Sequence, residues 1–199
     1  MSLTQRPVDP KGNRQYKVIT EPLIEPITVS DLKVFARIDT TAEDTLLAGF
    51  ITAARQACEM YLGRVLISQT IRMTMDYWPS KKIELPFPPL ISITSVETID
   101  ESDVATTYSS DNYYVVTEAI PGELVVKQGV SVPSNTVRDV AGYRIEYVAG
   151  YGLTAAEVPS QIREALKLWA TSIYENRSLT PEPPPEARTL LDLYRVIKL

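Results

Sequence analysis

The sequence predicts an α+β protein, because the spacing of its apolar residues changes twice along the chain. Apolar residues first recur at helical spacing, and short runs rich in β-branched and aromatic residues follow between residues 65 and 151. Helical spacing returns after residue 152. We therefore expect a small helical bundle, with two main antiparallel helices plus short helices. We expect it to carry an inserted antiparallel β subdomain and extended terminal arms.

The first main helix is predicted over residues 42–62. Thr40 and Glu43 have the spacing of a capping box at its start, and Gly63 stands where a left-handed C-terminal cap belongs. One apolar face runs along this helix, formed by Leu47, Phe50, Ile51, Ala54, Cys58, Tyr61 and Leu62. A face of this kind needs a partner surface, so the helix should belong to the core.

The second main helix is predicted over residues 160–176, after Pro159. A shorter helix should begin at Thr28, which forms a second capping-box pattern with Asp31. The two main helices should pack together and bury four side chains that lie on their apolar faces: Phe50, Ala54, Trp169 and Ile173.

The middle of the chain is predicted to form five or six short antiparallel strands. Its apolar runs are too short for helices and are separated by turn segments such as WPSKK, PFPP, DESD and IPGE. The expected organisation is an N-terminal arm over 1–20, a helical core over 21–64 and 153–178, a β subdomain over 65–152, and a proline-rich spacer with a C-terminal helix over 179–199.

Composition argues against several classes of function. The 199 residues are 44% hydrophobic and 23% charged, which is typical of a globular protein. The net charge of −5 disfavours a general electrostatic grip on nucleic-acid phosphates. The absence of histidine removes the usual nucleophile systems and the commonest zinc ligand. No apolar run approaches the length of a membrane span and the N-terminus lacks a signal-peptide pattern, so we expect a protein made in a cytoplasm.

Three features could carry chemistry, and each has a simpler structural interpretation. Asp100, Glu101 and Asp103 could hold a hard cation, but the more economical interpretation is a solvated hairpin tip. The AGYG segment at 149–152 lacks the lysine and hydroxyl of a phosphate-binding loop and suits a strand-to-helix junction. Cys58 lies on an apolar helix face, as a core thiol does. We expect no catalytic residue, no metal site and no cofactor.

Tyrosines suggest an alternative. Several of the eleven fall on predicted strands, and a face of stacked rings could bind a sugar or a protein: Tyr113, Tyr114, Tyr143 and Tyr147. Half-buried strand positions explain the same residues. A β-rich carbohydrate- or protein-binding module therefore stays open, with a carboxylate-based hydrolase as a third possibility.

The C-terminus is predicted to be a docking device. Four prolines between residues 181 and 185 favour an extended, semi-rigid spacer. The stripe that follows would anchor a helix on another surface, through Leu190, Leu191, Tyr194 and Ile197. A helix of about a dozen residues is marginal by itself in water, so it needs such a surface.

Two ordered motifs resemble the head–tail connector, or adaptor, proteins of long-tailed bacteriophages. The first is PITVSDLKVFARID followed by AARQACEMYLGR, and the second is IEYVAGYG followed by VPSQIREALKLWATSIYENR. PFPPLISITSVETID between them also has the look of that family. The resemblance covers about residues 18–178.

This resemblance implies a structural virion protein without enzymatic activity, assembled in the bacterial host cytoplasm. Connectors of this type form a ring, twelve-fold in the expected case, beneath the portal. They join the capsid vertex to the stopper or tail-completion protein and enclose the channel through which DNA leaves. The implied partners are further copies of the chain, the portal and the stopper, with no specific nucleic-acid binding and no membrane. In that family a C-terminal helical extension docks on the portal, which would give the helix at 187–198 its partner.

Overall fold

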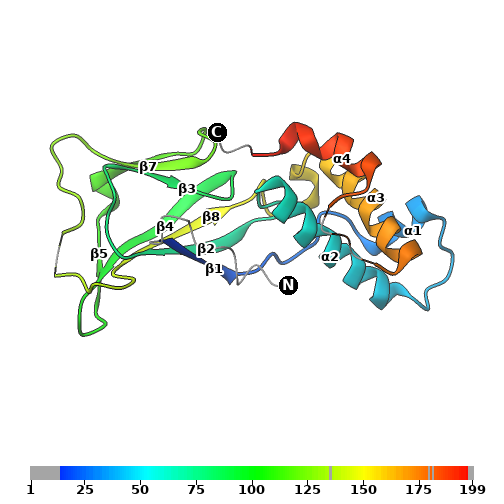
Figure 1. Ribbon diagram of the computed structural model, residues 1–199, viewed down its shortest axis with the longest axis horizontal. Coiled ribbons are helices and arrows are strands. Elements are labelled where there is room, and N and C mark those ends of the chain that lie inside the picture. The colour runs from blue at the N-terminus through cyan, green and yellow to red at the C-terminus, as the bar shows by residue number, and fades with distance from the viewer. Residues whose placement is uncertain (1–13, 135, 179, 181, 197–199) are drawn as a thin grey trace. The chain divides into compact units, whose positions relative to one another are not determined.

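A computed structural model describes residues 14–134, 136–178, 180 and 182–196 (Figure 1). The described residues form four α-helices and two antiparallel sheets, which confirms the α+β class. They divide into two compact units, and the residues of each unit mainly contact one another. We call residues 14–21 and 68–150 the β unit, and residues 22–67 and 151–196 the helical unit.

The β unit contains a five-stranded and a three-stranded sheet. In spatial order the larger sheet consists of β1 (Arg14–Thr20), β2 (Gln69–Met75), β8 (Tyr143–Ala149), β4 (Leu90–Ile99) and β5 (Ala105–Thr107). The smaller sheet consists of β3 (Lys82–Leu85), β7 (Gly122–Val126) and β6 (Tyr113–Val116). Each neighbouring pair of strands is antiparallel.

The first strand corrects the prediction of an N-terminal arm over residues 1–20. Residues 14–20 form β1, which pairs antiparallel with β2 from Arg14 opposite Met75 to Thr20 opposite Thr70. The remainder of the predicted arm lies outside the described residues. The sequence RQYKVIT includes β-branched and aromatic residues that suit a strand, whereas the prolines at positions 7 and 10 precede it.

Alternating burial builds the core of the β unit. Along β2, every second side chain is buried, including Ile71, Met73 and Met75. The two sheets touch where β7 begins, because a Cβ on Gly122 would lie only 2.4 Å from the Cβ of Leu90 on β4. Only glycine fits this approach without a shift of its neighbour.

The helical unit contains α1 (Val29–Ala36), α2 (Asp44–Leu62), α3 (Ser160–Asn176) and α4 (Pro185–Leu191). Short 3-10 turns lie at Ala155–Glu157 and Asp192–Tyr194. The third helix packs against the other three (Figure 1). Among the described residues, none of these helices has both the length and the apolar character that crossing a membrane requires.

One hydrophobic cluster holds the helical unit together. Trp169 and Ala54 are completely or almost completely buried in it, and Ile173 is 4% exposed, as predicted. Phe50 is only partly buried, because it lies at the rim, where its ring contacts Tyr174 with a centroid separation of 6.4 Å.

The caps of the helices follow the sequence in two places and depart from it in a third. Thr28 and Asp31 form the predicted capping box, and Gly63 has the left-handed conformation with φ 66°. The predicted box at Thr40 and Glu43 is wrong. Helix α2 begins at Asp44 without a side-chain cap, since Glu43 instead accepts a hydrogen bond of 2.7 Å from the Tyr174 hydroxyl.

Candidate assembly interface

The predicted docking stripe lies on the surface of its own helical unit. Leu191 is completely buried, and Leu190 and Tyr194 pack partly buried against the same cluster. Ile197 lies outside the described residues. Ala187 is also completely buried, one helical turn before Leu191, so one face of α4 belongs to the core.

This packing corrects the prediction that the prolines hold the C-terminal helix away from the rest of the chain. Pro183 is itself buried. Pro184 is the N-cap of α4 and Pro185 its first residue, a position where the missing N–H costs nothing and the fixed φ suits a helix. The prolines therefore start the helix, and the apolar face of α4 decides where it lies.

Polar contacts fasten the segment after α4 to the end of α2. The Tyr61 hydroxyl donates a hydrogen bond to Asp192, a contact that raises the pKa of Tyr61. The Arg64 Nε donates to the backbone carbonyl of Tyr194 at 2.6 Å. The N–H of Val196 donates to the carbonyl of the last α2 residue at 2.9 Å. We call residues 185–196 the C-terminal segment; it contacts the rest of the helical unit at intervals from Ala187 to Val196.

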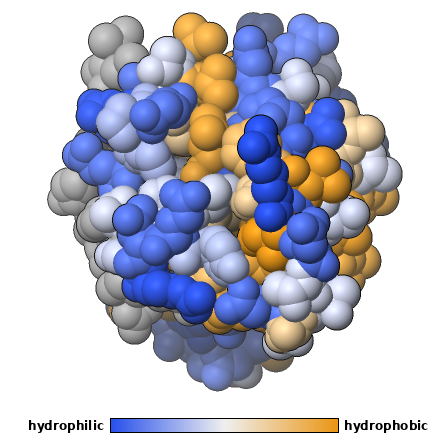
Figure 2. Space-filling view, turned by 90° about the vertical axis from the view of Figure 1, so that its right-hand side faces the viewer, coloured by the Kyte–Doolittle hydropathy of each residue, from blue (hydrophilic) through white to orange (hydrophobic). Residues whose placement is uncertain are grey.

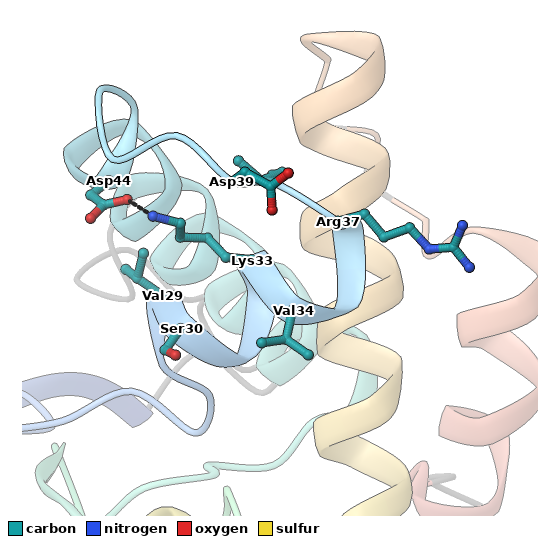
Figure 3. A pocket seen from close by; sticks show the side chains of 8 residues that line it. Val29, Ser30, Lys33, Val34, Arg37, Asp39 and Asp44 are labelled. Carbon is teal, nitrogen blue, oxygen red and sulfur yellow. Dashed lines mark hydrogen bonds and ion pairs between the residues drawn. The ribbon is translucent and has the colours of Figure 1, made fainter.

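A second surface lies at α1 and the connection to α2. It is a shallow groove of about 560 Å³, in which Lys33 forms an ion pair of 2.8 Å with Asp44 (Figure 3). Arg37, with φ 55°, points away from this pair, and Val34 is 79% exposed. The groove contains a neutralised charge pair beside an exposed apolar side chain, which suits contact with another protein better than chemistry.

The surrounding face of the helical unit has the same mixed character. Figure 2 shows apolar patches set between hydrophilic residues on this side of the molecule. The exposed apolar residues of the helical unit include Phe35 on α1 and Leu46 on α2. Lys167 on α3 lies 6.0 Å from the centre of the Phe35 ring. Exposed apolar patches rimmed by charges are typical of protein–protein contact surfaces.

The acidic cluster is a turn between β4 and β5. Asp100 Oδ1 accepts hydrogen bonds from the N–H groups of Ser102 and Val104, each at 2.9 Å. Asp103 forms an ion pair with Arg138. Two of the three carboxylates thus have structural partners, and the described residues contain no group of three or more potential metal ligands. The hairpin-tip interpretation fits these contacts.

The other candidate residues have structural roles. Cys58 is completely buried, and this burial raises the pKa of its thiol well above its ordinary range. In the AGYG segment, a Cβ on Gly152 would lie 2.1 Å from the carboxyl carbon of Glu157. That carboxylate accepts from the N–H of Thr154 at 2.8 Å. The segment is therefore a tightly packed junction that leads toward α3.

The four tyrosines do not form one exposed face, although Tyr108 and Trp78 join Tyr113 and Tyr143 in one aromatic cluster. Tyr147 is completely buried and donates a hydrogen bond to the Pro86 carbonyl, and Tyr113 is 7% exposed. Tyr114, the next residue on β6, is 59% exposed and lies under Lys127. Tyr143 packs against Trp78. A flat binding platform needs several exposed rings on one face, and these four residues do not supply it.

Sequence reasoning missed a buried ionic network on α2. Glu59 is completely buried, where it accepts from Arg55 at 3.0 Å and from the N–H of Leu66 at 2.9 Å. Arg55 also donates to Glu25 at 2.7 Å. Burial disfavours the charged guanidinium, but Glu59 and Glu25 raise the pKa of Arg55. The spacing of Arg55 and Glu59, four residues apart within an apolar face, was the available signal.

Three solved structures with a similar fold come from gene transfer agent particles. A chain described as belonging to the virion of a native gene transfer agent particle is 21% identical, with a TM-score of 0.79. A chain from the neck of the empty particle, computed with C6 symmetry, is 22% identical, with a TM-score of 0.77. A chain from the neck of the native particle, computed with C12 symmetry, is 21% identical, with a TM-score of 0.74. Each match covers 93% of this chain and 97% of the other.

Among curated proteins, none matches this chain. A family model described as "HCP: Head completion protein" matches residues 25–197, which include all of the described helical unit from Glu25 onward and most of the β unit. This match confirms the resemblance that the two sequence motifs indicated. The chain belongs to the head completion protein family.

Proposed function

We propose that this chain is a structural connector in the neck of a phage-like particle, where it joins the head to the tail. The observation that carries this proposal is the family match over residues 25–197. The fold likeness to chains from a particle neck supports it, since it extends over 93% of the chain. The surfaces described above suit protein contacts, and no pair of described residues stands out as a nucleophile and its base. In this proposal the role is therefore structural rather than enzymatic.

The connector is proposed to be a ring of identical subunits beneath the portal, with DNA passing through its centre. The similar neck structures were computed with C6 and C12 symmetry, which supports a ring of twelve copies. A net charge of −5 per chain suits a channel wall, because a wall rich in Lys and Arg would bind the phosphates of passing DNA. The stopper or tail-completion protein would bind the side of the ring away from the portal.

Portal docking through Leu190, Leu191, Tyr194 and Ile197 remains part of the proposal, with one added requirement. Leu191 is buried in the subunit itself, so it reaches a portal only if the C-terminal segment leaves the helical unit. Docking would then exchange an internal contact for an external one. Twelve such segments acting together gain from effective concentration, which offsets the cost of release in each subunit.

A disulfide lock tests the release. An ideal Cβ at Gly63 lies 3.7 Å from the Cβ of Val196, within the range that disulfides span. The variant Gly63→Cys with Val196→Cys should therefore fasten the C-terminal segment to the end of α2. Oxidised protein should fail to bind the portal, and reductant should restore binding. Each single-cysteine variant serves as the control for the strain that a side chain suffers at the positive φ of residue 63.

The two possible results of the lock have opposite meanings for docking. If the oxidised double variant binds the portal as well as the wild type does, the segment stays in place and the predicted docking stripe is wrong.

The wider proposal of a connector role has its own test. Particles produced without this chain should be DNA-filled heads that lack tails, and adding the purified full-length chain should restore tail attachment. Normal tailed particles in its absence would contradict a connector role.

A further inference from the structure

The five-stranded sheet of the β unit ends in two different edge strands. Strand β1 forms one edge and β5 the other, and no further strand among the described residues pairs with the outer side of either (Figure 1). All three residues of β5 are exposed. An open edge presents a row of unsatisfied N–H and C=O groups that can pair with another chain. The β unit therefore offers two distinct surfaces, at opposite ends of one sheet.

The β1 edge carries a positive charge. Lys17 is exposed and stands directly opposite Arg72 on β2, and like charges in this position repel. Arg72 has a carboxylate of its own, since it forms an ion pair of 2.6 Å with Glu146 on β8. No ion pair of Lys17 occurs among the residues that the structure describes. Ile19, two residues further along the same face, is 39% exposed.

The β4–β5 hairpin at the other edge carries a negative charge that forms no ion pair with any described residue. In the turn between β4 and β5, Asp100 caps backbone N–H groups and Asp103 pairs with Arg138. Glu101 at the tip is exposed and forms no ion pair within the described part of the chain. Val104 beside it is 56% exposed. This edge thus combines an exposed carboxylate with an exposed apolar side chain. The β1 edge similarly combines the exposed amine of Lys17 with the exposed apolar side chain of Ile19.

The geometry points to a contact between two copies of this chain, in which the β1 edge of one subunit meets the β4–β5 hairpin of the next and Lys17 faces Glu101. This inference rests on the ring of the proposed function and names the surfaces that would join its subunits. The two surfaces differ, so the contact is head to tail, which is the type that closes into rings. A two-fold contact through one edge alone would bring either two copies of Lys17 or two copies of Glu101 into the same interface, because the two residues lie at opposite edges of the sheet.

Strand direction sets the form of the contact. Four successive antiparallel steps separate β1 from β5, so the two edge strands run in the same direction within one sheet. Backbone pairing between β5 of one subunit and β1 of its neighbour would therefore be parallel. Because the charged residues stay near the surface, the contact should weaken as salt rises.

Cross-linking tests the pairing of surfaces. The double variant Lys17→Cys with Glu101→Cys, oxidised as the full chain in concentrated solution and in assembled particles, should form covalent multimers of increasing size. Each single variant should remain monomeric under denaturing, non-reducing conditions. The native Cys58 is completely buried and should not react.

Charge reversal tests the interaction itself. Lys17→Glu or Glu101→Lys alone should weaken self-association about tenfold or more, because each places like charges together. The double reversal should restore it. Lys81→Glu and Glu118→Lys are matched controls, since both side chains are exposed on the β unit and lack described ion pairs. They should leave self-association unchanged.

The outcomes separate this inference from the proposed function. Rings seen by electron microscopy in particles, together with no multimers from the double cysteine variant, would overturn the edge contact and leave the ring intact. Efficient dimers from a single cysteine variant would show a two-fold contact and also overturn it. Particles that contain only single copies of the chain would overturn both. Multimers with rescue by the double reversal support the edge contact.

Discussion

Replacing Leu191 by alanine tests whether the C-terminal segment belongs to the folded helical unit. The side chain is completely buried in the hydrophobic cluster, together with Ala187 from the preceding turn. Deleting a buried leucine side chain costs its transfer free energy and leaves a cavity, about 2–5 kcal/mol in all. A value toward the lower end is expected here, because a terminal helix can detach while the rest stays folded.

The assay can follow the helical unit alone. The chain has two tryptophans, and Trp169 lies in the helical unit whereas Trp78 lies in the β unit. In a Trp78→Phe background, fluorescence during urea unfolding therefore reports on the core around Trp169. The midpoint should fall for Leu191→Ala, with the slope unchanged. Hydrogen exchange should show faster opening of α4.

Leu193→Ala is the matched control. Leu193 is two residues away and 74% exposed, so its truncation should change the free energy of unfolding by less than about 0.5 kcal/mol. Equal, small effects at Leu191 and Leu193 would refute the packing described here and would favour a segment free to dock elsewhere. Deleting residues 179–199 should likewise destabilise the helical unit, because it removes Ala187 and Leu191 from the hydrophobic cluster and uncovers core surface.

Three further predictions concern the body of the subunit. Trp169→Ala should cost about 3–5 kcal/mol in unfolding free energy, and a nearly neutral effect on urea unfolding would contradict its burial. Glu59→Leu should cost about 3–5 kcal/mol because it leaves the buried guanidinium of Arg55 with Glu25 as its only described carboxylate partner and removes the acceptor of the Leu66 N–H. Arg55→Met with Glu59→Leu should cost less, and equal costs would count against the network. Hydrogen bonds from the backbone N–H and the hydroxyl of Thr28 hold the pKa of Asp31 below its ordinary value. The stability that the ionised carboxylate contributes is therefore present near neutral pH and is lost as pH falls through the lowered pKa. The melting temperatures of wild type and Asp31→Asn should therefore converge at low pH, and a constant difference from pH 7 to pH 3 would rule this out.

Local sequence signals predicted those parts of the fold that short-range physics decides. Helical spacing placed α2 and α3 to within two residues, since the apolar face, the preceding proline and Gly63 all act locally. The capping box at Thr28 formed for the same reason. At Glu43 the local rule failed, because a hydrogen bond to Tyr174, which is 131 residues away, was available to the carboxylate. Sequence spacing carries no information about such a partner.

The candidate surfaces were less predictable than the elements that carry them. The turn at Asp100 was recognisable from the sequence. That Arg138 pairs with Asp103 and not with Glu101 was not, because it depends on the tertiary structure. Likewise, strand register places Lys17 opposite the like charge of Arg72, and Lys17 forms no ion pair with any residue that the structure describes. Register and long-range pairing are tertiary properties, so a sequence shows which charges exist without showing which of them are neutralised.

The C-terminal segment shows the same limit most directly. Periodic apolar residues indicate that one face of a helix is buried, and they are silent about which molecule buries it. Leu191 is buried by its own subunit, and its removal from that site would expose apolar surface costing roughly 1.5–3 kcal/mol for a side chain of this size. Hydrogen bonds from Tyr61 and Arg64 add to the cost of release. A portal that captures the segment must therefore offer more than an apolar groove. It must also provide hydrogen-bond donors for the Asp192 carboxylate and the Tyr194 carbonyl. Otherwise docking loses the free energy that these groups gain from their hydrogen bonds within the subunit.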